Sequence, residues 1–387
     1  MEWDSAGVTV VESSGTTWKP GEEWLIGEEP LLEVGSLDGP EASSFGFVAD
    51  AVWLSDERLV VLDQMLVSLR AFDGQGRLLG DWARKGDGPG ELERPREIVR
   101  LPGDSILVEE FGGVGSVFDS EGRFVRRFRL PVEEWSMGDM SIEVFNWSRY
   151  GLIDRLWDGS YLVQLRAWLD RGPGTRPERV GLARLTEEGA GDTITVVTAG
   201  RYGVESDGRG IRVVGTHFDP HVLAGAHAGQ VYVSDGSAFS YRIYSAEGDL
   251  ATVVRLLWSR TPVDQALKER WRENRSQYWG QSPEPGVPPG RLQELFEATA
   301  YPDSLPAFVA LRVDARGFVW GEAMPSRNFS EPSAEHFVFA PSGAFLGVVK
   351  APRGLRVTEI GDDHVVGVWR DENDVDYVRV YELSRRQ

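Results

Sequence analysis

The chain of 387 residues contains no cysteine, and this absence excludes several kinds of site at once. Disulfide bridges, zinc–thiolate centres, iron–sulfur clusters and cysteine nucleophiles all require the missing thiol. The chain also lacks any apolar run of roughly 18 residues, the length that a membrane-spanning helix needs. No signal peptide is recognisable in it. We therefore expect no membrane span and no cysteine-dependent chemistry.

Basic residues are outnumbered, with 41 Lys and Arg against 61 Asp and Glu, so the net charge is −20. A protein this acidic is repelled by phosphate backbones, and no local basic face interrupts the acidic character. The sequence therefore argues against a nucleic-acid partner. Hydrophobic residues make up 41% of the chain, which is enough for a large packed core and excludes disorder as the dominant state.

One strand pattern recurs along the chain, in which a polar turn precedes an apolar, β-rich run. Most copies lie about 45 to 70 residues apart, which leaves room for about four short strands in each unit. The six copies are residues 55–62, 103–108, 158–163, 228–233, 315–320 and 361–366. This pattern predicts an all-β fold: a single six-bladed antiparallel β-propeller that fills residues 1–387 as one domain.

A glycine-centred turn follows most copies of the pattern. Gly76, Gly122, Gly248 and Gly343 each follow Asp, Ser or Glu side chains and precede an apolar run. Asp, Ser and Gly at these offsets are typical of hairpin turns that need a positive φ angle at the glycine.

The longest interval, between the fourth and fifth copies, predicts a helical insertion at about 261–300. Thr261 and Pro262 have the order of a helix cap and a first helical residue. The apolar face of this helix would consist of Val263, Leu267 and Trp271, and a second, shorter helix is expected after Gly290.

Ring closure is expected to involve both ends of the chain, because an open propeller would expose a strand edge. A short apolar run occupies residues 8–12, and another occupies residues 378–383. We expect the N-terminal strand 8–12 to close the last blade, with residues 16–44 as the connection to the first blade.

A loop motif adds a family resemblance. Gly86, Gly88, Pro89, Gly90 and Glu91 have the order Gly-x-Gly-Pro-Gly-Glu. The motif resembles a loop of bacterial six-bladed β-propellers related to NHL-repeat and TolB-like proteins, and the likeness extends over essentially the whole chain. It implies the propeller fold and a location outside the cytoplasm, either periplasmic or lipid-anchored. We expect the loop to be a tight crossing between blades, with Glu91 bonded to nearby N–H groups, rather than an anion cradle.

Candidate ligand-binding residues follow from propeller geometry, because ligand sites cluster where the innermost strands enter the central channel. The repeat alignment places Arg96, Tyr150, His221, Phe308 and Arg356 at these positions. Since Arg96, His221 and Arg356 belong to alternate blades, they would focus positive potential on one opening and attract a small anion. Alternatively, each arginine pairs with a local carboxylate.

Catalytic and metal-binding motifs are weak. No Gly-x-Ser-x-Gly elbow occurs, so we assign no catalytic residue. His217, His221 and His227 could supply metal ligands together with Asp219. Their irregular spacing and the intervening Pro220 favour a polar segment whose imidazoles bond to the backbone. No metal and no cofactor are predicted.

The leading functional prediction is a monomeric, non-enzymatic β-propeller that binds either a protein or a small anionic ligand. The alternative is a metal-dependent propeller hydrolase or lyase of the lactonase kind. Buried Glu, Asp, Asn or His side chains that converge on the channel would favour this alternative.

Overall fold

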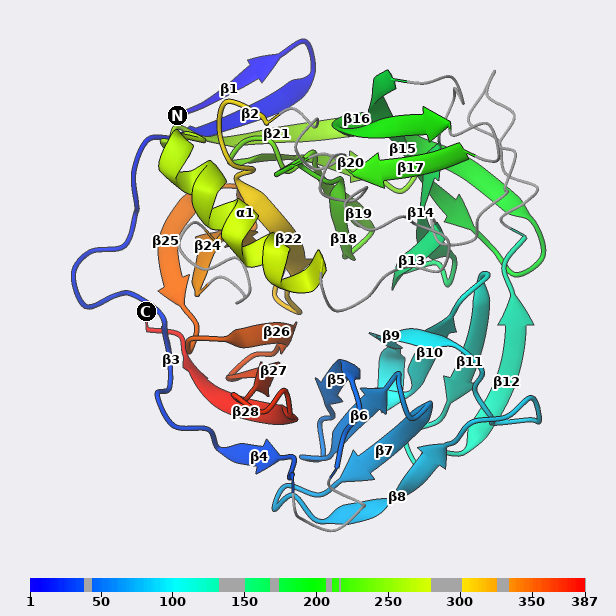
Figure 1. The fold of residues 1–387 in the computed structure, drawn as a ribbon. Helices are drawn as coiled ribbons and strands as arrows, with labels where there is room; N and C mark the ends of the chain where they lie inside the picture. Colours follow the sequence, from blue (N-terminus) through cyan, green and yellow to red (C-terminus); the bar gives the residue numbers. More distant parts are fainter. Residues whose placement is uncertain are drawn as a thin grey trace.

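Six sheets form a closed ring in the computed structural model, which confirms the predicted six-bladed antiparallel propeller (Figure 1). The structure describes residues 1–37, 44–131, 150–167, 174–206, 211–215, 217–279, 301–325 and 334–386. Among these residues, no helix is both long enough and apolar enough to cross a membrane.

The innermost strand of each blade begins a short antiparallel sheet that runs outward from the ring axis. From blade 1 to blade 6, these innermost strands are β5 (Val48–Trp53), β9 (Pro95–Arg100), β13 (Tyr150–Arg155), β18 (Leu223–His227), β22 (Phe308–Val313) and β26 (Leu355–Ile360).

The repeated apolar runs of the sequence become the second strand of each blade. These strands are β6 (Leu59–Asp63), β10 (Ile106–Glu110), β14 (Tyr161–Ala167), β19 (Gln230–Ser234), β23 (Val319–Ala323) and β27 (His364–Arg370). They lie between two neighbours in their sheets, and their residues are mostly buried, which explains their dense Val and Leu content.

The outer strands complete the blades. The third strands are β7 (Ser68–Phe72), β11 (Val114–Phe118), β15 (Gly174–Leu185), β20 (Ser240–Ser245), β24 (Glu335–Phe339) and β28 (Asp376–Ser384). The fourth strands of blades 1 to 5 are β8 (Leu78–Ala83), β12 (Phe124–Arg129), β16 (Ala190–Ser206), β21 (Leu250–Leu256) and β25 (Phe345–Lys350), and blade 3 adds β17 (Ile211–Gly215).

The glycine turns between the third and fourth strands have the predicted backbone geometry. The φ angles of Gly76, Gly122, Gly248 and Gly343 are +76°, +77°, +95° and +85°. In the second of these turns, a Cβ on Gly122 would also lie within 2.4 Å of the Trp82 ring of blade 1. Glycine therefore meets two requirements there, the backbone conformation and the close approach of a neighbouring blade.

The core consists of six apolar clusters, each shared by two neighbouring blades. Between blades 1 and 2, Leu62 and Leu69 pack with Val108 and Phe118. The cluster between blades 6 and 1 closes the ring, because it joins Val366 and other residues of β27 to residues of β5. Burial of these faces against each other is the main force that holds the ring together.

The closing strand differs from the prediction. β2 (Val8–Ser13) pairs in parallel with β21 on the outer edge of blade 4, and β1 (Glu2–Ser5) adds a hairpin to it, so the expectation that strand 8–12 closes the last blade was wrong. Instead, β3 (Leu25–Ile26) and β4 (Leu32–Val34) pair antiparallel with β28 and complete blade 6. β4 alternates the buried Leu32 and Val34 with an exposed Glu33, as an outer strand should, whereas in β3 Leu25 is exposed and Ile26 is half-buried.

The inserted helix α1 (Gln265–Trp279) falls within the predicted range and lies over blade 5, on the face of the ring where β22 begins (Figure 1). It starts later than predicted, because Asp264 rather than Thr261 accepts a hydrogen bond from the Leu267 N–H at 2.8 Å. Leu267 is buried, and Val263 and Trp271 pack with it, so the predicted apolar face is confirmed. The second predicted helix lies in residues 280–300, outside the described residues.

The loop at residues 86–91 is a crossing between β8 and β9, as expected. The Glu91 carboxylate accepts a hydrogen bond from the Gly88 N–H at 3.1 Å and pairs with Arg84 at 3.3 Å. A Cβ on Gly86 would meet the same carboxylate at 2.0 Å. The glycines therefore make room for Glu91, which ties the loop together from within.

Candidate ligand site at the ring centre

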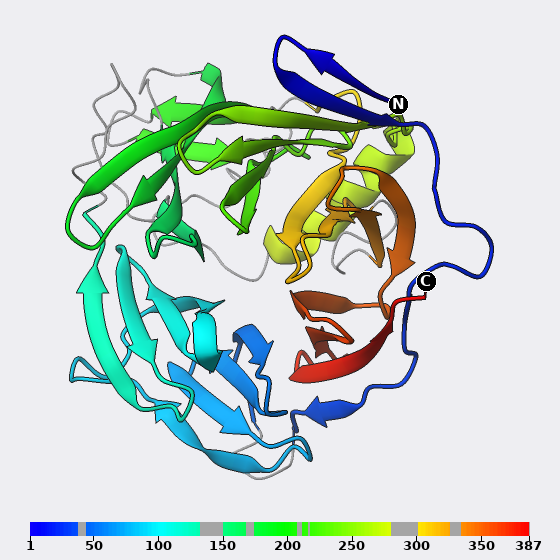
Figure 2. The same ribbon diagram turned by 180° about the vertical axis from the view of Figure 1, so that it is seen from behind.

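Charged side chains from four blades gather near the axis, where the innermost strands approach one another (Figure 2). Glu97 on β9 is the centre of this group. Its side chain is exposed to solvent, and it makes no hydrogen bond to another described residue. Burial among protein atoms nevertheless raises the pKa of Glu97, and this rise is opposed by the positive charges of Arg96, Arg312 and Arg356. Water thus reaches the side chain although protein atoms surround the carboxyl.

Glu109 lies directly behind Glu97 on the paired strand β10. Its Oε2 is 3.8 Å from the Nε of Arg96, whereas its buried Oε1 has no hydrogen-bond partner among the described residues. Burial, together with the negative charges of Glu97 and Glu110, raises its pKa to about 8, against the opposing effect of Arg96. Glu109 is therefore mostly protonated at neutral pH.

Asp50 on β5 is the third acid of the group. Its Oδ2 accepts a hydrogen bond from Ile98 N–H on β9, and its Oδ1 accepts one from Ala51 N–H, both at 2.9 Å. Burial raises its pKa to about 7, although these two hydrogen bonds act in the opposite direction. Because its bond to Ile98 connects blades 1 and 2, Asp50 has a structural role.

Arg356 on β26 is held by the backbone of the next blade. Its guanidinium donates to the carbonyl oxygens of Val48 at 2.6 Å and Ala49 at 3.0 Å. Burial lowers its pKa, with Asp50 as the main opposing charge. Arg356 therefore contributes positive potential at the axis, while its donors already join blade 6 to blade 1.

Arg312 on β22 belongs to blade 5, which lies across the ring from blade 2 and its residues Arg96 and Glu97. It donates to the carbonyl of Val357 at 2.6 Å and lies 3.6 Å from Glu322. Its side chain is 30% exposed, close to the 32% of Arg96, so both guanidinium groups can be reached from solvent. Behind it lies His336, whose pKa is lowered to about 3 by burial and by Arg312, so this imidazole is neutral.

The ligand-binding residues predicted from the sequence do not all lie in this charged group. Arg96 and Arg356 belong to the charged group. Arg96 lies 3.8 Å from the Glu109 carboxylate, whereas Arg356 donates to the carbonyl oxygens of Val48 and Ala49. His221 is exposed in the segment before β18 and is not among the charges that perturb Glu97, Glu109 or Asp50. Tyr150 is the first residue of β13, opposite Leu165, and its side chain lies outside the described residues.

Phe308 does not line an opening. It is 0% exposed and packs against Phe239 and Phe337, with ring centroids 5.3 Å and 6.0 Å away, in the core between blades 4 and 5. The sequence alignment placed it at the correct strand end but on the wrong face, since adjacent strand residues point in opposite directions.

One member of the histidine cluster, His217, contacts the inserted helix α1. His217 is buried, accepts a hydrogen bond from Trp271 Nε1 at 3.1 Å on its Nδ1, and stacks on Tyr301 at 4.3 Å. This imidazole is thus bonded to a side chain of α1, and the backbone bonds expected of the cluster stay a prediction. In the described part of the chain, no group of three or more His, Asp or Glu side chains is arranged to hold a metal ion.

Sequence reasoning missed Glu97, Glu109 and Arg312. The available signal was a carboxylate placed next to apolar residues inside a strand, such as Glu97 before Ile98 and Glu109 after Val108. Such a residue costs folding free energy unless it is paired or reaches water, so it marks a special environment.

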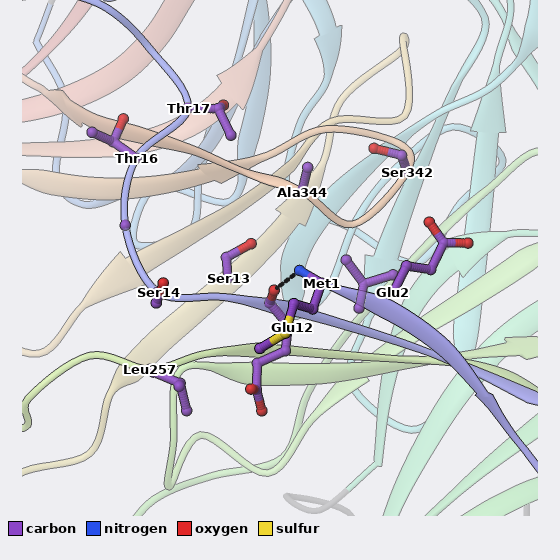
Figure 3. A pocket seen from close by; sticks show the side chains of 12 residues that line it. Met1, Glu2, Glu12, Ser13, Ser14, Thr16, Thr17, Leu257, Ser342 and Ala344 are labelled. Atoms are coloured by element: carbon purple, nitrogen blue, oxygen red, sulfur yellow. Dashed lines mark hydrogen bonds between the residues drawn. The ribbon is translucent and has the colours of Figure 1, made fainter.

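A cavity of about 500 Å³ lies elsewhere, at the outer rim (Figure 3). It is bounded by the N-terminal hairpin and by the turn at Ser342 and Ala344, and the Met1 amino group bonds to the Glu12 carbonyl beside it at 2.6 Å. It lies beside β1 and β2, on the outer edge of blade 4, and is remote from the innermost strands at the ring axis.

Comparisons with known proteins found similar chains among the solved structures only. No family model matches the chain, and no curated protein matches its sequence. Among solved structures, a member of the DUF4221 family from Bacteroides vulgatus is similar, with 8% identity, 94% of this chain and 99% of the other covered, and a TM-score of 0.46. Virginiamycin B lyase from Staphylococcus aureus has 9% identity, coverages of 94% and 99%, and a TM-score of 0.40. A gluconolactonase from Xanthomonas campestris has 13% identity, coverages of 88% and 87%, and a TM-score of 0.40.

Proposed function

We propose that this protein is a non-enzymatic binding propeller that takes a small anionic ligand at the centre of the ring. Arg96 and Arg312 would contact the ligand, and Arg356 would add positive potential from behind. A ligand carboxylate or phosphate suits two planar guanidinium groups, because each can donate parallel hydrogen bonds to it.

One observation carries this proposal: three arginines from blades 2, 5 and 6 act on the single exposed carboxyl of Glu97. Their positive potentials therefore overlap at a point that solvent reaches. In a protein with a net charge of −20, such a point is a local exception that an anion would find favourable.

Protonation of the neighbouring acids supports anion binding further. Because the pKa values of Glu97 and Glu109 are raised, these carboxyl groups can take up protons when an anion binds. In the protonated form they do not repel the anion. A protonated carboxyl also becomes a hydrogen-bond donor to the ligand.

The test compares three variants by calorimetric titration with a panel of small anions, namely citrate, succinate and inorganic phosphate. Replacing Arg96 and Arg312 with Gln should weaken binding at least about tenfold for each arginine, the usual effect of losing a charge-assisted hydrogen bond. The Glu97→Gln variant should bind more tightly, since it removes the competing negative charge. The control is Arg379→Gln, because Arg379 pairs with Glu33 on the outer edge of blade 6.

Unchanged affinity in the double variant, with the melting temperature retained, would contradict the proposal. Weaker anion binding by Glu97→Gln would contradict it independently, because that change leaves both arginines in place.

A catalytic role is the second candidate, and one observation favours it. Glu97 and Glu109 are neighbours with raised pKa values, and Glu109 titrates near pH 8, in the range that suits general acid–base catalysis. Metal analysis of the purified protein and hydrolysis assays with lactones test the metal-dependent form. A stoichiometric divalent ion whose removal abolishes a hydrolytic activity would replace the binding proposal.

The narrower family assignment, to NHL-repeat or TolB-like propellers, is part of the proposal, together with a monomeric state and a location outside the cytoplasm. Its support is the Gly-x-Gly-Pro-Gly-Glu loop at residues 86–91. Cell fractionation of the native protein and light scattering of the purified protein test these points. Recovery in the cytoplasm, or a dimeric mass, would overturn the corresponding part.

A further inference from the structure

A second charged group lies far from the ring axis, where the C-terminal end of the chain meets the N-terminal segment. Arg385 follows β28, and Trp24 precedes β3, which pairs with the end of β28 (Figures 1 and 2). The Arg385 side chain is only 7% exposed. A buried arginine at the end of a chain needs an explanation, because desolvation of a guanidinium is costly unless the surroundings compensate for it.

Aromatic rings surround this guanidinium. Its Cζ lies 4.7 Å from the Trp24 ring centroid, 5.5 Å from that of Phe318 and 6.0 Å from that of Trp320. All three distances are within the range of cation–π attraction. Trp24 also contacts Phe318 and Trp320 directly, with ring centroids 4.8 Å and 5.7 Å apart, so the rings form one continuous wall.

A single carboxylate supplies the opposite charge. The Nη2 of Arg385 donates to Asp314 Oδ2 at 2.8 Å and to the Gly361 carbonyl at 2.7 Å. Asp314 is itself fixed, since Trp320 Nε1 bonds to the same oxygen at 2.9 Å and the Phe318 N–H bonds to Oδ1 at 3.0 Å. The orientation of the Asp314 carboxylate is therefore fixed by blade 5 itself and does not depend on Arg385.

The two other nitrogen atoms of the Arg385 guanidinium, Nε and Nη1, indicate which kind of cation the site prefers. Nε and Nη1 are buried and have no oxygen partner in the described structure. A planar guanidinium can present such N–H groups and its flat face to aromatic rings, because its charge is delocalised and weakly hydrated. An ammonium group is strongly hydrated and would lose more on entering the same space.

We propose that Trp24, Phe318, Trp320 and Asp314 form a guanidinium-binding cage, that Arg385 occupies it as a latch between blades 5 and 6, and that the emptied cage binds a free guanidinium compound. The cage joins three parts of the chain: blade 5 supplies Asp314, blade 6 supplies the Gly361 carbonyl, and the N-terminal segment supplies Trp24. The latch thus reinforces the closure made by β3 and β4 at the same side of the ring.

The experiment is chemical rescue of the Arg385→Ala variant in the full chain. We expect its melting temperature to fall by about 5 °C or more, because Asp314 is left buried without its cation. Methylguanidinium at millimolar concentration should restore at least half of this loss in a saturable manner. Methylammonium at the same concentration should restore little, and wild-type protein should respond to neither.

Two further variants separate a specific cage from a general salt effect. Arg379→Ala is the matched control, because Arg379 also lies over an aromatic ring, Trp369, at 3.8 Å, but at the outer edge beside Glu33. Methylguanidinium should not rescue it. Adding Trp24→Leu to Arg385→Ala should abolish the rescue, since the ring nearest to the guanidinium is then missing.

Rescue by methylammonium equal to that by methylguanidinium would overturn the proposal, as would an unchanged melting temperature of Arg385→Ala. If Arg385→Ala does not fold by itself, its refolding only in the presence of methylguanidinium supports the cage. If it refolds neither with nor without methylguanidinium, Arg385→Lys provides the test. This variant keeps the charge, and it should still melt several degrees below wild type because an ammonium cannot satisfy the site. A wild-type melting temperature for Arg385→Lys would then refute the cage.

Discussion

Closure of the ring by β4 can be tested with an engineered disulfide, because the chain has no cysteine that could interfere. Glu33 on β4 lies directly opposite Arg379 on β28. Opposed residues in an antiparallel pair have Cα atoms about 4.5 to 5.5 Å apart, within the range that a disulfide tolerates. We therefore expect Glu33→Cys/Arg379→Cys to cross-link spontaneously under mild oxidation.

The expected magnitude follows from the size of the closed loop. The bridge would enclose a loop of roughly 350 residues, for which the chain-entropy estimate is about 6 kcal/mol. Engineered bridges often deliver less, so about half of this is a realistic expectation. At roughly 2 °C per kcal/mol for a large domain, the oxidised protein should melt about 5 °C above its reduced form.

The assay compares the same protein with and without reductant, so losses caused by the two substitutions cancel. Mobility in a non-reducing gel and intact mass report the cross-link, and thermal denaturation reports its effect. The control pair is Val10→Cys/Val380→Cys, which joins β28 to the strand first expected to close the ring, and it should not cross-link. Cross-linking of this control, or failure of the first pair to form a bridge, would refute closure by β4.

Three other perturbations test local parts of the account. Phe308→Ala should destabilise the fold by about 3 to 5 kcal/mol, because a fully buried ring is lost from the interface of blades 4 and 5, and denaturant titration measures this; a loss below 1 kcal/mol would place the ring outside the core. Gly86→Ala should cost only about 1 kcal/mol, since the new Cβ displaces the end of the flexible Glu91 side chain, and a much larger loss would mean that the backbone itself cannot adapt. Stability should fall as the pH rises from about 5 to 8 and level off above pH 8, because in this range the folded state holds the Glu109 proton whereas the unfolded state releases it near pH 4; Glu109→Gln should flatten this slope, and an equal slope in both proteins would show that another group is responsible.

The blade architecture was predictable because each blade repeats the same physical problem. A second strand buried between two neighbours is mostly apolar, and the turn after the third strand needs glycine at a positive φ angle, as Gly122 shows. These constraints are local, so they leave a visible pattern six times. The same holds for the face of α1, where Leu267 and Trp271 reveal their packing by spacing alone.

Ring closure was less predictable because it depends on pairing between distant segments. The run at residues 8–12 is longer than the Leu32–Val34 segment and contains three apolar residues against two, which made it the more plausible partner for β28. What decides the outcome is tertiary: β21 offers β2 an outer edge in blade 4, which no local pattern can reveal.

The ring centre was predicted only in part. The alignment found Arg96 and Arg356, which lie at strand ends, but it could not tell that Phe308 turns into the core while Arg312, four residues later, reaches the axis. The small bulge between Phe308 and Ala310 shifts the alternation of side chains along β22. A bulge of this kind leaves no signature in a single sequence, so the facing of charged residues needed coordinates.

The most direct test of the central claim is the proton uptake that accompanies anion binding, measured by titrating citrate into the protein in two buffers of different ionisation enthalpy. If the anion binds beside Glu97 and Glu109, the protein should take up protons on binding at pH 7.5, and its affinity should rise as the pH is lowered from 8 to 6. Both effects should be smaller in Glu97→Gln. Proton release on binding, or an affinity that rises with pH, would contradict an anion site at the centre of this ring.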